Sequence, residues 1–249
     1  MGYIINPYSV SPVAPSEPPS TNLWGRWRAN DVAGSDGDEI SSVTDLSGNA
    51  RNLTGFANAA KSNTKPKLRT NVINGKSAFE FNGGGWFTIP AMNGIAGGAE
   101  VFFIVKGDND PATDSLDANL HRMDTTANDN HFPLTDGNIH DGFAKTSRAD
   151  FGNPSVSLSA AYLCYNLSCT TAPALTAYLN GTQQGSTSIT GSYGCAAAPK
   201  IGRSASAGSC EFKGRVAEVI VYDGVLADGG ADKNAVEAYF ASFYGITFS

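Results

Sequence analysis

The sequence predicts an all-β protein that is closed by a single C-terminal helix. The first observation is a strand at residues 216–222 that is apolar on both of its faces. Its side chains are expected to divide as Val216, Ile220 and Tyr222 on one face against Ala217, Val219 and Val221 on the other. A strand with one solvated face alternates apolar and polar residues, so another element must cover the second face of this one.

The segment that follows supplies the cover. Its apolar residues recur at i, i+3, i+4 and i+7, which makes one stripe along a helix: Val236, Tyr239, Phe240 and Phe243. Asp228 or Asp232 is expected to cap the start of this helix, and Gly245 its end. Only 16% of the residues are charged and 28 are glycine, a balance typical of turn-rich β proteins.

The remaining strands are marked by their turns. A first strand is expected at 23–27, and Gly48 supplies the left-handed residue of the turn at 45–49. Asn74-Gly75 and Asn180-Gly181 are hairpin signals between strand-like runs. Residues 101–105 are apolar on both faces, which predicts a central strand. Residues 108–130 lack periodicity and are expected to form a long loop over the edge of the sheets.

We expect two parts: an extended Pro-rich arm at 1–22 and one sandwich domain at 23–249. Five of the 12 prolines lie in the arm, so it should be extended rather than helical. A free tail would not need the apolar residues at its start. We therefore expect the arm to dock on a partner through Tyr3, Ile4, Ile5, Tyr8 and Val10.

Charge and hydropathy exclude two partner classes. The formal net charge is −6, with no basic run that would release counterions from phosphates, so nucleic acid is not expected as a partner. No apolar run is long enough to span a membrane. The N-terminus has neither a basic region nor a long apolar core, so we expect a protein that is made and kept in a cytoplasm.

The four cysteines match no zinc-binding spacing, and no cofactor or metal is expected. Two alternatives stay open, free buried thiols or one or two local disulfides among Cys164, Cys169, Cys195 and Cys210.

An ordered set of motifs resembles the laminin-G-like branch of the concanavalin A-like lectin/glucanase superfamily. The set comprises DLSGNARNL at 45–53, NGKSAFEFNG at 74–83, LNGTQ at 179–183, KIGR at 200–203 and FKGRVAEVIVYD at 212–223. The resemblance implies two antiparallel sheets packed as a jelly roll. Glycan-cleaving members carry Glu-x-Asp-x-x-Glu on one strand, and that spacing is absent here, so no enzymatic activity is expected. Glu218, alone on an apolar strand, is expected to pair with a cation.

A narrower resemblance concerns structural proteins of tailed bacteriophages. It rests on HFPLTDGNIHDGF at 131–143, on the Arg148 that follows, and on the leader that reads INPY. It implies a virion component assembled in the host cytoplasm, with the major capsid or a tail protein as partner. A capsid decoration protein, of the cement or head-fibre type, is the first reading; a glycan-binding tail adhesin or carbohydrate-binding module is the alternative. Self-association stays open.

The glycan-binding alternative has candidate residues. One Gly-punctuated loop offers donors and acceptors for sugar hydroxyls, with Phe143 or Trp86 as a stacking face. The loop residues are Asp136, Asn138, His140 and Asp141. The same residue types are common in ordinary turns, which is the competing interpretation. The Asp-rich stretch from Asp108 to Asp117 fails the EF-hand pattern and is expected to be a solvated loop.

Overall fold

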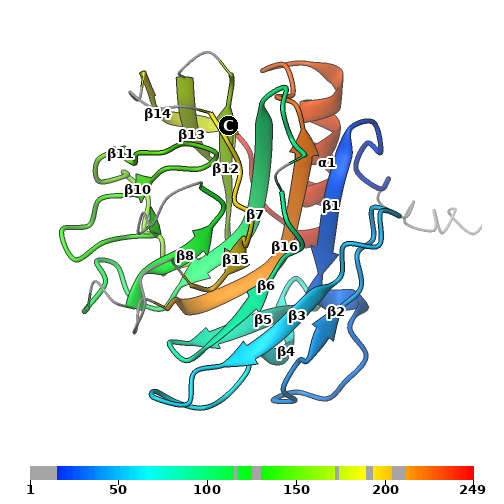
Figure 1. Cartoon of the computed structure of the whole chain (residues 1–249), viewed down its shortest axis with the longest axis vertical. Coiled ribbons are helices and arrows are strands. Elements are labelled where there is room, and N and C mark those ends of the chain that lie inside the picture. The colour runs from blue at the N-terminus through cyan, green and yellow to red at the C-terminus, as the bar shows by residue number, and fades with distance from the viewer. Residues whose placement is uncertain are drawn as a thin grey trace, which may run out of the picture.

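The protein is an antiparallel β-sandwich of the jelly-roll type with one helix near its C-terminus, as the sequence predicts (Figure 1). The computed structural model describes residues 16–92, 94–114, 117–124, 130–171, 174–188, 193–203 and 211–249. The arm residues Tyr3, Ile4, Ile5, Tyr8 and Val10 lie outside the described residues, so the docking prediction stays a prediction.

Sheet A forms one layer of the sandwich. In spatial order it contains β14 (Thr182–Ser188), β13 (Ala174–Leu179), β12 (Leu163–Cys169), β7 (Ala99–Gly107), β16 (Lys213–Asp223), β5 (Lys76–Asn82) and β4 (Lys67–Ile73), with β1 (Leu23–Arg28) also paired to β16. A short 3-10 helix, η1 (Ala29–Asp31), follows β1. The predicted central strand at 101–105 is the core of β7.

Sheet B forms the other layer and consists of short strands. In spatial order these are β11 (Ala149–Asp150), β10 (His140–Asp141), β9 (Asn130–His131), β8 (Asn119–Arg122), β15 (Lys200–Ile201), β6 (Gly85–Thr88), β3 (Leu53–Ala57) and β2 (Ser42–Val43). The prediction of a continuous loop at 108–130 is wrong, because β8 lies inside it. The inward polar residues Asn119 and His121 are fully buried, and they hide the strand from a hydropathy pattern.

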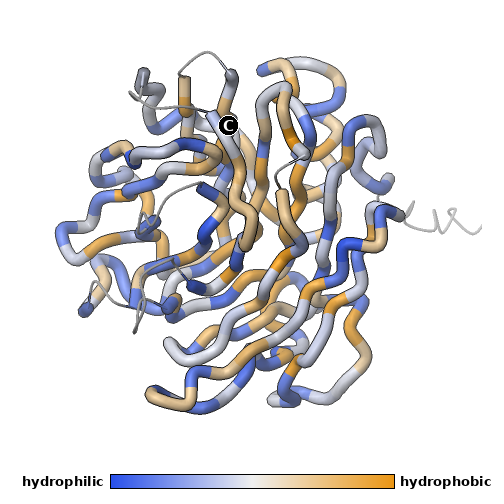
Figure 2. The backbone as a smooth tube through the Cα atoms, in the orientation of Figure 1, coloured by the Kyte–Doolittle hydropathy of each residue, from blue (hydrophilic) through white to orange (hydrophobic). Residues whose placement is uncertain are grey.

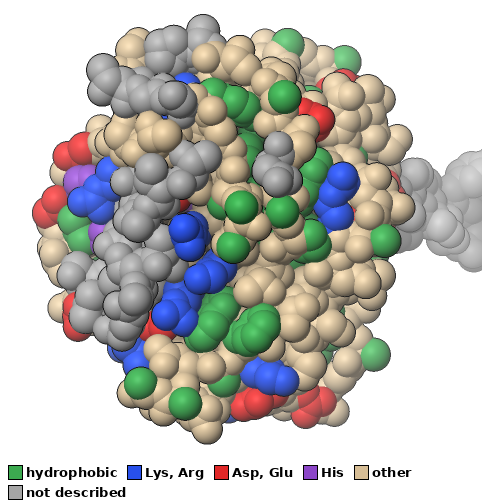
Figure 3. Space-filling view, in the orientation of Figure 1, with side chains coloured by type: hydrophobic (Ala, Val, Ile, Leu, Met, Phe, Trp, Pro, Cys, Tyr) green, Lys and Arg blue, Asp and Glu red, His purple; other side chains and the backbone are tan. Residues whose placement is uncertain are grey.

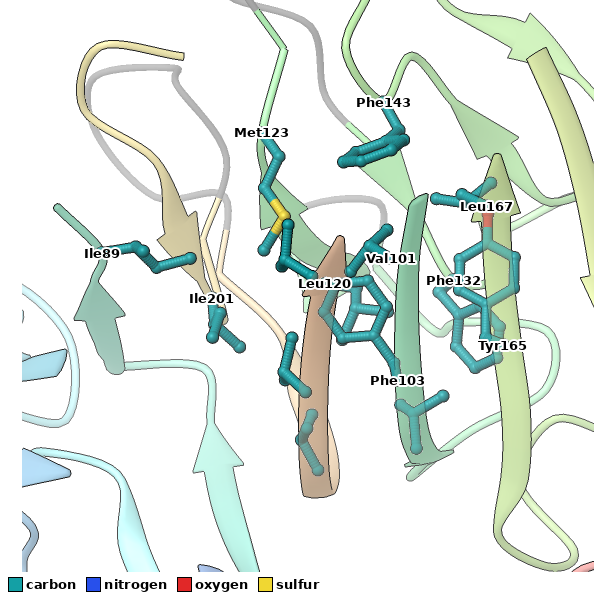
Figure 4. Close-up of a cluster of buried hydrophobic side chains, with 14 of the residues drawn as sticks. Ile89, Val101, Phe103, Leu120, Met123, Phe132, Phe143, Tyr165, Leu167 and Ile201 are labelled. Atoms are coloured by element: carbon teal, nitrogen blue, oxygen red, sulfur yellow. The ribbon is translucent and has the colours of Figure 1, made fainter. Parts of the chain in front are cut away.

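Two hydrophobic clusters divide the core. The larger one lies between the sheets, where Phe103, Leu120, Phe132 and Tyr165 pack together (Figure 4). The smaller one lies between sheet A and the helix α1 (Ala231–Tyr244), and it includes Phe102, Ile220 and Phe240. Apolar chain segments accordingly concentrate in the central strands, and hydrophilic ones in the outer loops (Figure 2).

The two-sided strand is β16, and its second face is covered by α1 as predicted. One detail of its predicted side-chain division is wrong. Val216 joins Val219 and Val221 between the sheets, while Ala217 joins Ile220 and Tyr222 under the helix. A shift of register between Val216 and Glu218 is the reason, since a β-bulge inserts one residue and reverses the parity of those before it.

The turns follow the predicted chemistry, and the helix cap does not. Asn74-Gly75 and Asn180-Gly181 have positive φ at both residues, as a two-residue hairpin turn requires. Gly245 ends α1 in the left-handed conformation, with φ 74°. The predicted aspartate N-cap is wrong: Gly230 is the N-cap residue, and no side chain caps the helix. No described helix has the length and hydropathy that a membrane crossing requires.

The cysteines of the described chain are free thiols. Cys164 lies under the helix, while Cys169 and Cys195 lie between the sheets. Burial raises the pKa of the Cys169 thiol to about 11 and that of Cys195 to about 12, which keeps both protonated and unreactive. Cys210 lies outside the described residues, so the disulfide alternative is settled only for the other three.

Candidate functional site

The loop predicted to bind sugar is the hairpin between β9 and β10. Three of its residues do come together. The backbone N–H of Asn138 donates to Oδ1 of Asp136 at 2.8 Å, and Nε2 of His140 lies 3.4 Å from Oδ2 of Asp136. The Asn138 amide donates to Asp150 at 3.1 Å, which ties the turn to β11. These bonds are those of an ordinary Asx turn, so the hairpin uses its polar groups on itself.

Two predicted members of that site lie in the core instead. Asp141 is only 2% exposed, and Phe143 is fully buried. Asp141 accepts a hydrogen bond from the Tyr165 hydroxyl at 3.0 Å, and its Oδ2 lies 2.9 Å from Nε2 of His121. Neither residue can touch a ligand on the surface. His121 and Tyr165 come from β8 and β12, far away in sequence, so no local pattern could have shown this arrangement.

The buried network continues to Asp124. The Asn130 amide donates to Oδ2 of Asp124 at 3.2 Å and to the carbonyl of His121 at 3.2 Å. Burial raises the pKa of Asp124 to about 7, with the nearby His121 acting in the opposite direction. His121 also stacks on Phe103, with ring centroids 5.2 Å apart. The residues of this polar cluster are each at most 2% exposed, so the cluster lies inside the protein.

Replacing Asp124 with asparagine is expected to change how stability depends on pH. The folded protein holds the Asp124 proton more tightly than the unfolded chain, whose pKa is near 3.8. The carboxyl therefore stabilises the fold at low pH, and this contribution is lost as the pH rises from about 4 to about 7. Urea unfolding at both ends of that range should show Asp124→Asn gaining stability relative to the native protein as the pH rises.

Asp36→Asn is the control for that measurement. Asp36 is exposed, and its pKa is lowered, first of all by the backbone N–H of Thr70. Its contribution is lost mainly below about pH 4, so Asp36→Asn should change the stability difference from the native protein only slightly between about pH 4 and about pH 7, and in the opposite direction. If the difference in free energy of unfolding between Asp124→Asn and the native protein is the same at both pH values, the raised pKa of Asp124 is contradicted.

Trp86 lies far from the predicted loop. It is on β6, and β15, β8 and β9 separate β6 from β10 in sheet B. Four strand spacings of about 4.8 Å place Trp86 roughly 19 Å from His140. The predicted single site that joins Trp86 to the 136–141 loop is therefore wrong. The two features lie at different ends of one sheet.

Trp86 belongs to a row of three stacked side chains on the outer face of sheet B. Phe56 is its register partner on β3, and the two rings stack at 5.7 Å with an angle of 10° between their planes. The Arg203 guanidinium lies over the Trp86 ring at 4.2 Å from its centroid. Because β6 lies between β3 and β15, these neighbours cover opposite faces of Trp86. The free aromatic surface is therefore that of Phe56, which is 43% exposed.

Local backbone chemistry explains why Phe56 points outward. In β3 the inward positions are Leu53 and Gly55, and Thr54 and Phe56 alternate to the solvent side. A Cβ on Gly55 would lie 2.0 Å from the carbonyl oxygen of Ile40, so only glycine allows the chain before β2 to approach this closely. Sequence reasoning missed Phe56, although an aromatic residue at the outward parity of a strand was a visible signal.

Two more cations adjoin this row. Lys200 on β15 pairs in register with Arg122 on β8 and with Thr88 on β6. Burial lowers the pKa of Lys200, and the positive charges of Arg203 and Arg122 lower it further. Figure 3 shows Lys and Arg side chains gathered over β8 and β15, beside a hydrophobic patch over β6 and β3. We call Phe56, Trp86, Arg203, Lys200 and Arg122 the aromatic–cationic surface.

In the Asp-rich stretch at 108–117, the carboxylates of Asp110 and Asp117 bond to other parts of the protein. Asp110 accepts the backbone N–H of Leu158 at 2.6 Å, and Asp117 pairs with Lys213 at 2.6 Å. Among the described residues, no three His, Cys, Asp or Glu side chains lie together as metal ligands would.

Comparison with known proteins identifies the fold. No family model matches the sequence, and no curated protein matches it. Solved structures do. The receptor-binding domain of botulinum neurotoxin mosaic serotype C/D is similar at TM-score 0.61 and 12% identity, over 88% of this chain and 51% of that one. Domain 4 of AbnA, an extracellular GH43 arabinanase from Geobacillus stearothermophilus in complex with arabinotriose, gives TM-score 0.55 and 15% identity over 88% and 98%.

A third similar structure is the ligand-binding domain of botulinum neurotoxin serotype D in complex with N-acetylneuraminic acid, at TM-score 0.57 and 12% identity over 88% of this chain and 51% of that one. This chain spans about half the length of the toxin domains that it matches. At these identities the comparisons show a shared β-sandwich fold.

Proposed function

We propose that this protein is a non-enzymatic glycan-binding domain whose binding face is the outer face of sheet B. The observation that carries the proposal is the Phe56 ring, which stacks on Trp86 from one side and is 43% exposed. Sugars present a face of C–H groups that packs against an aromatic ring, and a supported ring does not lose side-chain freedom when it binds. Phe56 is thus a rigid, partly open platform on a solvated sheet.

The surroundings of the platform suit a sugar. Thr54 and Thr88 point outward on the same strands, and their hydroxyl groups can exchange hydrogen bonds with sugar hydroxyls. The similar structures support the class of ligand: arabinotriose is bound in the arabinanase domain complex, and N-acetylneuraminic acid in the serotype D toxin complex.

Three carboxylates engaged inside the protein support a binding role over hydrolysis. Glu218 lies under the helix and pairs with Arg26 at 2.6 Å, which fits the predicted cation partner. Glu100 accepts from Asn166 at 2.9 Å and from the backbone N–H of Leu226 at 2.7 Å. Glu211 accepts from Asn58 at 2.7 Å. A glycosidase needs two carboxyl groups that both face the substrate, and these three are fully buried and bound to the protein.

Replacing Phe56 with alanine is expected to weaken glycan binding by about tenfold or more, since removal of an aromatic anchor costs at least 1.4 kcal/mol in such sites. The measurement is a printed glycan array, followed by calorimetric titration of the tightest oligosaccharide. Val156→Ala is the matched control, because Val156 is also 43% exposed and lies in a loop outside sheet B. Undiminished binding by Phe56→Ala, or no binding by the native protein to any glycan, would refute the proposal.

The virion setting is a further part of the proposal, supported by the resemblance to bacteriophage structural proteins. The described end of the arm is anchored on the side of sheet A: Tyr222 donates to the carbonyl of Pro19 at 3.0 Å, and Glu17 pairs with Arg26. An arm that leaves from this side would hold the domain with sheet B facing outward, which suits an adhesin or a decoration protein equally. Immunogold labelling of purified particles tests the setting, and unlabelled particles would count against it.

A further inference from the structure

We infer that the glycan bound by this protein is anionic, and that Arg122, Lys200 and Arg203 bind its carboxylate or sulfate groups. This inference rests on the proposed function. Arg122 on β8 and Lys200 on β15 are paired in register, and Arg203 follows β15 closely in sequence. Arg203 also contacts Trp86, so the cations adjoin the aromatic row. The ligand would therefore contact an aromatic platform and a positive surface together.

Two of the three cations, Arg122 and Lys200, have no ion-pair partner among the described residues. This is so although the chain has a formal net charge of −6. Nε of Arg122 is buried and has no hydrogen-bond partner among the described residues. Leaving a buried charged donor unpaired costs free energy, and a bound anion would supply the missing acceptor.

The positive charge of Lys200 is also disfavoured by its surroundings. Burial and two neighbouring positive charges, Arg203 and Arg122, all disfavour its charged form. A carboxylate or sulfate between these side chains would favour that form, and its binding would relieve the repulsion. The surface is therefore destabilised when free and complementary to an anion when bound.

Arg203 is held in place for such a contact. Its guanidinium carbon lies 4.2 Å from the centroid of the Trp86 ring, and its Nε is 3.8 Å from the buried carboxylate of Glu211. Lys61 approaches the same carboxylate at 3.1 Å, so Glu211 does not belong to Arg203 alone. A guanidinium held against an aromatic ring can present its remaining N–H groups in the fork that suits carboxylate and sulfate oxygens.

The spacing indicates an oligosaccharide. Phe56, Trp86, Lys200 and Arg122 follow one another across β3, β6, β15 and β8. Three strand spacings make this row roughly 14 Å long, which exceeds the reach of a single sugar ring. A chain with an acidic sugar over Lys200 and Arg122, and a neutral face on Phe56, fits the surface.

The test uses matched pairs of glycans: sialyllactose and lactose, oligogalacturonate and its methyl ester, and sulfated and unsulfated N-acetyllactosamine. The native protein is expected to bind the acidic member of at least one pair about tenfold tighter, and added salt should reduce this preference. The double variant Arg122→Gln, Lys200→Gln should lose the preference. Lys76→Gln, Lys106→Gln is the control, because it removes the same charge near the helix-covered face of sheet A.

Four outcomes would overturn the inference. Equal binding of both members of every pair, lost in Phe56→Ala, leaves the proposed function standing and refutes the anionic ligand. No binding of any glycan refutes both. An acidic preference that survives in the double variant places the anion elsewhere. If a single-stranded oligonucleotide binds as tightly as the acidic glycan, and Phe56→Ala does not weaken that binding, the surface binds polyanions in general and a glycan is refuted as the ligand.

Discussion

Replacing Glu218 with alanine is expected to lower the free energy of unfolding by about 3–5 kcal/mol, the usual cost of leaving one partner of a buried ion pair alone. Glu218 is fully buried between β16 and the helix. It receives hydrogen bonds from Arg26 at 2.6 Å, Tyr239 at 2.7 Å and Tyr244 at 2.8 Å. The variant would leave Arg26 charged and 5% exposed, without its carboxylate partner inside the protein.

Urea unfolding at neutral pH measures the effect, and Glu17→Ala is the control. Glu17 also pairs with Arg26, but its side chain is 60% exposed. Exposed ion pairs contribute about 0–1 kcal/mol, so this variant should be close to native. If Glu218→Ala lowers the free energy of unfolding by less than about 1 kcal/mol, the Glu218 network does not hold the helix on sheet A.

Replacing Phe103 with alanine is expected to cost about 3–5 kcal/mol as well, because it removes a large ring from the centre of the inter-sheet core. Phe103 is fully buried on β7 and lies between the two sheets (Figure 4). Its ring stacks on His121 at 5.2 Å and on Tyr165 at 6.4 Å. The cavity would therefore also remove the apolar support of the His121–Asp141–Tyr165 network.

Chemical denaturation of Phe103→Ala and Phe103→Leu measures this, and the leucine variant should lose much less because it fills most of the volume. Equal losses for the two variants would show that ring stacking on His121, and not volume, carries the stability.

Much of the fold could be predicted from local sequence patterns. The two-sided strand required a cover, and the helical stripe of Val236, Tyr239 and Phe240 supplied it. Both Asn-Gly hairpins follow from residue types that tolerate positive φ. The errors arose where geometry is not local. The bulge after Val216 reverses a side-chain parity, and β8 carries His121 and Asn119 inward where a hydropathy pattern expects apolar residues.

The candidate site was less predictable than the fold. Trp86 was expected to offer a stacking face to a sugar, and the structure instead places Phe56 and Arg203 against its ring. Asp141 has the residue type of a ligand-binding loop, and only the contacts with His121 and Tyr165 show that it is internal. Arg122, Lys200 and Arg203 are separated by up to 81 positions in sequence, and sheet order alone brings them together.

The direct test of the proposed binding face is a crystal structure of the protein with the tightest-binding acidic oligosaccharide from the array. The structure predicts a sugar ring on the open face of Phe56, with its acidic neighbour between Lys200 and Arg122 on the outer face of sheet B. A sugar bound instead at the 136–140 hairpin, or on the helix side of sheet A, would contradict the account.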